Sequence, residues 1–305
     1  MEKITLNDGN QIPVLGFGPG IAGYSTKHKR LSNNNFISFS QRALNKFFFR
    51  PRCYRNYVSA ISSAINNGFY LLDYSAAYGN GTLIGKAIKK SGIEREKLFI
   101  TTRISNRAQF NDCIEDEFFE QLKNIGIDYV DLLMFHWPVT DKYVDTYKKM
   151  IELKKQGFVR SLGVANCHQH HLNTLIEATG IVPCINQFEV HPLFTQKPLV
   201  EFCKEHKISV EAYTPVARFD DRLMNCPLLK KIGDKYGKSI IQVVLRWHIQ
   251  NGLIPVVRTL NEKHQKENLD IFDFNLSNDE LKAIDGMNIN SRLRFDPDNC
   301  DFTML

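Results

Sequence analysis

An aspartate and a tyrosine stand five positions apart in the stretch LLDYSAAYGN, residues 71–80. The apolar residues before Asp73 are typical of a buried strand, and the Asn-Gly pair after Tyr78 predicts a turn. The strand therefore ends by placing a carboxylate and a phenol where its side chains begin to meet solvent. A nearby fixed positive charge would lower the pKa of the phenol from its ordinary value of about 10. Tyr78 could then donate a proton to an oxygen that is becoming an alkoxide.

Polar or ionisable residues also close the other predicted strands: Arg103, His136, Asn166, Gln187, Tyr213 with Thr214, and Arg258. Arg103 would supply the positive charge, Asp73 would hold Arg103, and His136 would orient or polarise the reacting oxygen. This set contains neither a Ser or Cys nucleophile paired with a base nor two free carboxylates for glycoside hydrolysis. A proton donor without a nucleophile implies that a cofactor supplies the electrons, and the set favours a nicotinamide.

The elements that must position these residues form a repeating pattern of strand and helix. Units of roughly 30 residues or more favour a single (β/α)8 TIM barrel domain over residues 1–305, in which the carboxyl ends of the strands meet at one mouth. The alternative, an open doubly wound sheet, lacks the expected glycine-rich turn and the acidic residue that follows it. The eight predicted strands are 13–18, 70–75, 98–105, 129–138, 159–167, 183–190, 209–216 and 253–260.

Local signals predict the elements around the barrel. The Asp8-Gly9 pair inside residues 3–18 predicts an N-terminal β-hairpin. Apolar residues four, four and three apart predict a helix over 114–125, and a second helix is predicted over 142–155. The SNDE sequence at 277–280 is a capping box that opens a helix over 278–286.

A long insertion, residues 21–56, follows the first barrel strand and is longer than a plain barrel loop. It lies on the face where barrel loops build active sites, so we interpret it as a lid or a wall of the substrate pocket. A surface insertion with no role in the chemistry is almost as well supported. Docking on a membrane surface through its Lys, Arg and Phe residues is a weaker third interpretation.

The composition indicates a globular protein, with 43% hydrophobic and 24% charged residues among 305. A net charge of +6 is too weak to indicate nucleic acid but suits anionic small molecules. Seven cysteines without CxxC spacing fit a reduced compartment, and no apolar run suits a signal peptide or a membrane span. We therefore predict a cytoplasmic protein with no integral membrane segment; its oligomeric state stays open.

Two further groups of polar residues are interpreted as structural. Cys167, His168, His170 and His171, in the stretch CHQHH, fit no common spacing of metal ligands, so we expect solvated or capping histidines and no bound metal. Asp128 and Asp131 flank the start of a predicted strand and are interpreted as caps or surface charges.

Several of these motifs, in this order, resemble the aldo-keto reductase family: LLDYSAAYGN, DLLMFHWP, GVANC, NQFEVHP, EAYTPV and the long block from QVVLRW to LSNDEL. The similarity runs from about residue 3 to the end and lapses only across the insertion. Asp-x4-Tyr-Gly alone is a weak signal, but its occurrence together with the other motifs, in this order, makes the combination specific. The resemblance implies NADP-dependent reduction of aldehydes or ketones, without a metal and with NADPH favoured over NADH.

The resemblance also implies a role for each matching residue. Tyr78 matches the proton donor, Asp73 its charge partner and His136 the substrate-orienting histidine. Asn166 and Gln187 match residues that hold the nicotinamide carboxamide, with Tyr213 stacking on the ring. The segments around the phosphates and the adenosine are matched by Thr214, Arg258, Thr259, Glu267 and Asn268.

Four departures from the family pattern matter. Arg103 replaces the usual lysine; its charge would still stabilise tyrosinate, but its fork could pair with Asp73 instead, so we expect slow turnover or a rebuilt geometry. The GFGPG stretch at 16–20 replaces a threonine and an aromatic residue of the substrate wall, which Tyr24 or a phenylalanine of the insertion could replace. Ala165 stands where serine is usual. His264 replaces an arginine near the 2′-phosphate, while Arg258 stands where lysine is usual.

Three functions therefore compete. The first is an NADP-dependent carbonyl reductase with a small-molecule substrate and Tyr78 as proton donor. The second is a weakly active or non-catalytic sensor or partner protein that binds the cofactor, motivated by Arg103 and the insertion. The third, a metal-dependent hydrolase that uses the histidine cluster, is remote.

Overall fold

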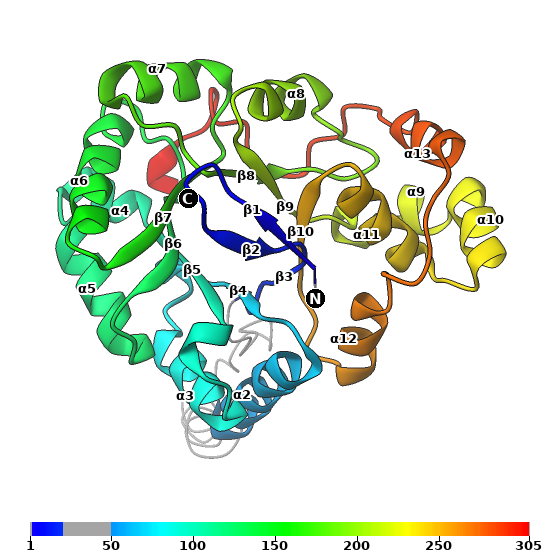
Figure 1. Ribbon diagram of the computed structural model, residues 1–305, viewed down its shortest axis with the longest axis horizontal. Helices are drawn as coiled ribbons and strands as arrows, with labels where there is room; N and C mark the ends of the chain where they lie inside the picture. The colour runs from blue at the N-terminus through cyan, green and yellow to red at the C-terminus, as the bar shows by residue number, and fades with distance from the viewer. Residues whose placement is uncertain (1, 21–49, 305) are drawn as a thin grey trace, which may run out of the picture.

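Eight parallel strands close into a barrel in the computed structural model, which describes residues 2–20 and 50–304 (Figure 1). The strands follow one another around the barrel in chain order, and the last, β10, closes the ring by pairing with the first, β3. This confirms the predicted (β/α)8 TIM barrel. The strands are β3 Gly16–Phe17, β4 Leu71–Asp73, β5 Phe99–Ile104, β6 Val130–Phe135, β7 Val159–Ala165, β8 Ile185–Glu189, β9 Ser209–Tyr213 and β10 Leu253–Val257.

Helices surround the barrel and cover its strands (Figure 1). Helix α5 shows why they form: Ile114, Phe118, Leu122 and Ile125 share one buried face, and Gly126, with φ +80°, ends the helix. The helices are α2 Arg50–Asn67, α3 Gly81–Ser91, α4 Asn106–Asn111, α5 Ile114–Ile125, α6 Tyr143–Lys155, α7 Gln169–Thr179, α8 Lys197–Glu205, α9 Asp221–Met224, α10 Pro227–Tyr236, α11 Ile240–Gln250, α12 Glu262–Leu269 and α13 Asn278–Asp285. The predicted capping box is present at the start of α13.

The predicted N-terminal hairpin covers the end of the barrel at which the strands begin (Figure 1). Strand β1, Lys3–Thr5, pairs antiparallel with β2, Gln11–Pro13, and Gly9 makes the turn with a φ of +89°. Leu6 and Ile12 pack in a buried cluster with barrel residues such as Phe99. The hairpin therefore closes this end, and the opposite end is left for the functional site.

Asp131 corrects one interpretation of the sequence. It lies inside β6 and is only 2% exposed, so it is neither a cap nor a surface charge. Its carboxylate pairs with Arg95 at 2.7 Å and Arg160 at 3.2 Å, and it accepts the N–H of Ile100 at 2.8 Å. A buried carboxylate needs such partners, and all of them come from other strands or from loops that the local sequence does not show.

The chain after α13 crosses the mouth of the barrel. We call residues 286–304 the C-terminal tail. The backbone N–H groups of Leu293 and Arg294 donate to the carboxylate of Glu189, at the end of β8, at 2.8 and 2.9 Å. Farther along, Phe302 packs on Trp137, which follows β6. The tail therefore passes over the ends of successive strands and forms part of the rim around the site.

Most of the predicted insertion, residues 21–49, lies outside the described residues, as does Tyr24. Residues 50–56, which we assigned to its end, form the first turns of α2. Among the described helices, none is both long enough and apolar enough to cross a bilayer.

Candidate active site

A single cavity of about 620 Å³ opens where the barrel strands end. Every residue that the sequence analysis selected lines it, although these residues are spread over most of the chain. The structure therefore brings the predicted set together, while the role of each member stays a prediction. The twelve are Asp73, Tyr78, Arg103, His136, Asn166, Gln187, Tyr213, Thr214, Arg258, Thr259, Glu267 and Asn268.

Asp73 and Tyr78 reach this cavity through a short, tight connection. Asp73 is the last residue of β4, and the 3-10 helix η2, Ala76–Tyr78, follows at once. Gly79 ends η2 in the left-handed conformation, with φ +58°, which glycine adopts without strain. The turn returns the phenol of Tyr78 to the wall that also holds Asp73. The arrangement answers why a strand ends on a carboxylate and a phenol: both belong to the rim of one cavity.

Arg103 is the buried centre of the charged network, with 2% of its surface exposed. Its Nη2 forms an ion pair with Oδ1 of Asp73 and also donates to Oε1 of Gln187 at 2.6 Å. Its Nη1 donates to the carbonyl oxygen of Tyr74 at 2.7 Å. The guanidinium thus pairs with Asp73 through one nitrogen and not through both arms of its fork. Burial acts to lower the pKa of Arg103, but Asp73 and then Tyr78 and Glu211 raise it, so the group stays charged.

His136 directly follows β6 and faces the same cavity. Burial, followed by the positive charges of Arg103 and Arg294, lowers the pKa of His136 to about 3. Its imidazole is therefore neutral at pH 7 and can donate one hydrogen bond to a substrate oxygen without carrying charge. Its backbone carbonyl accepts from Nδ2 of Asn166 at 2.9 Å, which joins the ends of β6 and β7.

Asn166, Gln187 and Tyr213 form the wall predicted to hold a nicotinamide. Asn166 has a left-handed backbone, φ +59°, and its Oδ1 accepts the hydroxyl of Tyr213 at 2.7 Å. Both polar atoms of the Gln187 side chain are hydrogen-bonded to charged groups: Oε1 accepts from Arg103, and Nε2 donates to Asp73 at 3.3 Å. The hydroxyl of Thr214 is buried and has no hydrogen-bond partner among the described residues. An unpaired buried hydroxyl beside a cavity is suited to a polar ligand atom.

The wall predicted to hold phosphates carries the guanidinium of Arg258. Arg258 lies so close to Gly20 that a Cβ on this glycine would come within 2.6 Å of the guanidinium Nε. Gly20 also has φ +61°, so the guanidinium rests against a backbone position that only glycine leaves open. His264 also lines the cavity and lies on α12 with Glu267 and Asn268.

The cavity also contains residues that the sequence analysis missed: Ser239, Arg218, Phe219 and Arg294. Ser239 could have been found from the S-x-x-Q capping box that opens α11. Arg218 and Phe219 lie in a loop whose residues 217–219 all have left-handed backbones, an unusual conformation for residues other than glycine. Nothing local in the sequence indicates Arg294, because the path of the C-terminal tail brings it there.

Glu211, beneath the cavity, was also missed. It is fully buried in β9, opposite Gln187 of β8, and neither carboxylate oxygen has a hydrogen-bond partner among the described residues. Burial, followed by the nearby Asp73 charge, raises the pKa of Glu211 well above its ordinary value. Its position two residues before Tyr213 was the available signal, because alternate strand residues face the same side and Tyr213 faces the cavity.

These residues fit a dinucleotide. Three cationic side chains, Arg218, Arg258 and Arg294, line the cavity and suit phosphate groups, as does the unpaired hydroxyl of Thr214, while the amides of Asn166 and Gln187 suit the polar edge of a nicotinamide. None of His168, His170 and His171 lines the cavity. The histidine cluster therefore does not supply metal ligands to this cavity.

Comparisons with known proteins point to one family. The sequence model of the Aldo/keto reductase family matches residues 54–289. The chain is 36% identical to methylglyoxal reductase DkgA of Escherichia coli K12 over 297 residues, 97% of this chain and 96% of the relative. It is 38% identical to a glyoxal reductase of Bacillus subtilis over 243 residues, 80% of this chain and 87% of the relative. Among solved structures, a Bombyx mori aldo-keto reductase in complex with NADP superposes with a TM-score of 0.82 at 30% identity, covering 97% of this chain and 96% of that one.

Proposed function

The chain belongs to the aldo/keto reductase family, and from this premise we propose that it reduces an aldehyde or ketone to an alcohol with NADPH, Tyr78 acting as the proton donor. The observation that carries the proposal is the meeting of Tyr78, Arg103 and His136 around one cavity. A phenol beside a permanent positive charge and a neutral imidazole is the arrangement that a carbonyl oxygen needs as it takes up a proton.

Each side chain has a distinct task in this reaction. His136, neutral at pH 7, donates a hydrogen bond to the carbonyl oxygen and orients it. Tyr78 gives its hydroxyl proton to that oxygen as negative charge develops there. The charge of Arg103 stabilises the resulting tyrosinate, and Asp73 keeps the guanidinium in place.

The cofactor residues follow from the same cavity. A bound nicotinamide dinucleotide supplies the hydride for carbonyl reduction. Asn166 and Gln187 would hold the carboxamide, and Tyr213 would stack on the ring. Thr214 would offer its unpaired hydroxyl to the phosphate and adenosine part of the cofactor. The phosphates and the adenosine would be held by Arg258, Thr259, Glu267 and Asn268. Arg258 and His264 provide cationic or hydrogen-bonding groups for a 2′-phosphate, which favours NADPH over NADH.

Small aldehydes are the substrates to test first. Two relatives carry the names methylglyoxal reductase and glyoxal reductase, so dicarbonyl compounds of this size head the panel. Longer aldehydes, keto-sugars and keto-steroids complete it.

A second candidate function is cofactor binding with weak or no turnover. The contact between Arg103 and Gln187 favours it, because Gln187 uses one polar atom on Arg103 and the other on Asp73. Such a glutamine is less available to a carboxamide than one without these partners. In this case the protein would act as a sensor of the cofactor or as a partner protein.

Fluorescence titration of NADPH, followed by oxidation of NADPH with the carbonyl panel, separates the candidates. For the reductase we expect saturable binding, turnover on at least one carbonyl, and loss of about 10²–10⁴-fold in kcat in Tyr78→Phe with NADPH binding retained. Tyr236→Phe is the matched control, because Tyr236 is half-buried and does not line the cavity. Tight binding without turnover on any carbonyl would support the second candidate and contradict the first. Turnover that a chelator abolishes would contradict metal-free reduction.

A further inference from the structure

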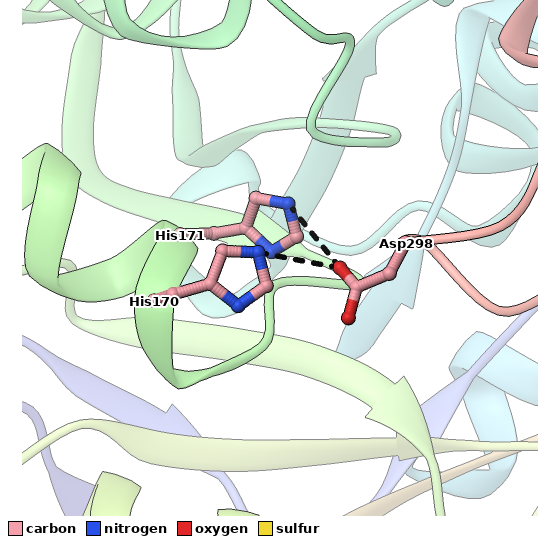
Figure 2. Close-up of side chains that lie close together, drawn as sticks. All are labelled: His170, His171 and Asp298. Carbon is pink, nitrogen blue, oxygen red and sulfur yellow. Dashed lines mark ion pairs between the residues drawn. The ribbon is translucent and has the colours of Figure 1, made fainter.

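A group of three histidines and one aspartate lies outside the active-site cavity, where the loop after β7 meets the C-terminal tail. His168 is the N-cap residue of α7, and His170 and His171 lie in its first turn. Asp298 comes from the tail and points its carboxylate at these imidazoles (Figure 2). The carboxylate stands 130 positions from His168 in the sequence, so the histidine spacing alone gave no sign of it.

We propose that His170, His171 and Asp298 bind one divalent transition-metal ion of the zinc class. Imidazole nitrogens and a carboxylate oxygen are ligands that Zn²⁺ prefers, and three protein ligands leave a position for water. The proposal stands apart from the carbonyl reduction proposed above, because none of these three residues lines that cavity.

The distances between the donor atoms fit such an ion. Nε2 of His170 lies 3.3 Å and Nε2 of His171 lies 3.7 Å from Oδ1 of Asp298 (Figure 2). Ligand atoms about 2.0–2.1 Å from a tetrahedral zinc are roughly 3.3–3.5 Å from one another. The two contacts are also longer than the usual 2.7–3.2 Å of an N–H···O hydrogen bond. The two Nε2–Oδ1 separations are therefore close to those of a coordination shell, and each of the three residues places a possible ligand atom within 4.8 Å of the others.

His168 supports the carboxylate from the other side. Its Nδ1 lies 2.7 Å from Oδ2 of Asp298, the oxygen that the two ligand histidines leave unused. A hydrogen bond of this kind orients a ligating carboxylate, so we assign His168 a positioning role. A second carboxylate, that of Asp296, lies near His168 and Asp298 and is paired with Arg292 at 3.7 Å.

The side chains of the site are accessible to an incoming ion, but binding the ion would break one hydrogen bond. The side chains of His170 and Asp298 are 62% and 39% exposed. The backbone N–H of His168 donates to Nδ1 of His171 at 3.1 Å. Binding through Nε2 of His171 requires the ring proton to move to Nδ1, so this cap hydrogen bond is given up. We therefore expect an affinity weaker than that of a closed structural zinc site.

Calorimetric titration of the full chain, without a histidine tag, with ZnCl2 is the direct test. We expect one ion per chain in the wild type. His170→Gln and Asp298→Asn should each lower the affinity at least ~10-fold, the scale on which even supporting residues of metal sites act. His206→Gln is the matched control: His206 is exposed, stacks on Phe202 and lies outside the cluster, so its loss should change nothing. Absence of stoichiometric binding, or unchanged affinity in His170→Gln, would overturn the proposal.

Two further measurements locate the ion. With Co²⁺ in place of Zn²⁺, the absorption spectrum should lack thiolate-to-metal charge transfer; its presence would assign the ion to cysteines and overturn the proposal. Zn²⁺ should also slow amide hydrogen exchange across residues 295–301 in the wild type, because the ion would join the C-terminal tail to α7. Stoichiometric binding with unchanged exchange there would place the ion elsewhere and equally overturn it.

Discussion

Arg103 and Gln187 are directly hydrogen-bonded: Nη2 of the arginine donates to Oε1 of the glutamine at 2.6 Å. The same nitrogen also pairs with Asp73. One guanidinium thus joins the charge partner of the predicted proton donor to a residue predicted to hold the nicotinamide. A lysine, with a single ammonium group, could not make these contacts and that to the Tyr74 carbonyl in the same planar geometry.

Arg103→Lys should raise the rate of carbonyl reduction. The ammonium would be freed toward the phenol of Tyr78, and Gln187 would be released toward the cofactor. We expect kcat to rise about 10-fold, a part of the 10²–10⁴ that a well-placed general acid contributes. Steady-state kinetics with methylglyoxal measure this, and Arg103→Met, which removes the charge, should fall below the wild type. If Arg103→Lys reduces carbonyls no faster than the wild type, the explanation that arginine at this position slows the reaction is wrong.

The titration of His136 should be absent from the pH profile of catalysis. Because its pKa is lowered to about 3, the ring is neutral throughout pH 5–8. We therefore expect no break in kcat near pH 6.5, the ordinary pKa of histidine. His264→Gln is the control, because His264 also lines the cavity and its own titration must be distinguished from that of His136. A break near pH 6.5 that persists in this control would show that His136 titrates normally.

The same shift makes stability depend on pH. Since the folded pKa of His136 is lower than the unfolded value of about 6.5, the unfolded chain binds a proton that the folded chain excludes. This contribution destabilises the fold progressively as the pH falls from about 6.5 to 3, by up to ~1.4 kcal/mol per pH unit. Urea unfolding of the wild type and His136→Gln measures it: the pH dependence over this window should be smaller in the variant.

Glu211→Gln should stabilise the protein at high pH. The pKa of Glu211 is higher in the folded chain than in the unfolded chain, where it is near 4.5. Its contribution to the free energy of unfolding is therefore fully present below pH 4.5 and is lost as the pH rises toward the folded pKa. Glutamine copies the neutral form at every pH. The free energy of unfolding of the variant should therefore exceed that of the wild type increasingly as the pH rises above 4.5. Glu205→Gln, at an exposed position, should show no such trend. A constant difference across pH would mean that Glu211 is ionised in the fold.

Arg258→Ala should weaken NADPH more than NADH. A hydrogen bond to a charged group contributes about 1.5–3 kcal/mol, so we expect a loss of roughly 10–100-fold for NADPH if Arg258 contacts the 2′-phosphate. Dissociation constants for both cofactors, measured by fluorescence, give the comparison. Lys266→Ala is the control: it removes an exposed positive charge on α12 that does not line the cavity, so it should alter neither constant. Equal losses for both cofactors would assign Arg258 to the shared pyrophosphate.

Asp131→Ala should strongly destabilise the barrel. It would remove the partner of Arg95 and leave the buried N–H of Ile100 without its acceptor. Breaking a buried pair in this way costs about 3–5 kcal/mol, which urea unfolding can measure. Asp145→Ala is the matched control, because its carboxylate is 72% exposed and pairs with Lys148 three residues on; we expect a change below about 0.5 kcal/mol. A similar small change in Asp131→Ala would contradict the buried role of this carboxylate.

The sequence by itself determined the barrel and the residues at its mouth. Strand alternation, helix periodicity and capping signals act over a few residues, so they predicted β4 to β10 and α5, and they showed that Asp73 and Tyr78 stand at the end of one strand. Because parallel strands of a closed barrel share a direction, a list of strand ends is already a list of neighbours.

Tertiary structure alone decided which groups bond to one another. Arg103 reaches Gln187 across 84 positions, and the buried Asp131 is paired with Arg95 from the 3-10 helix before β5 and with Arg160 from β7. Asp298 meets the histidines of α7 only because the C-terminal tail crosses the mouth of the barrel. These contacts depend on how the barrel closes and on the path of the tail, and burial then sets the charge of Glu211 and His136. Such effects arise between segments far apart in the chain, so no local pattern in the sequence contains them.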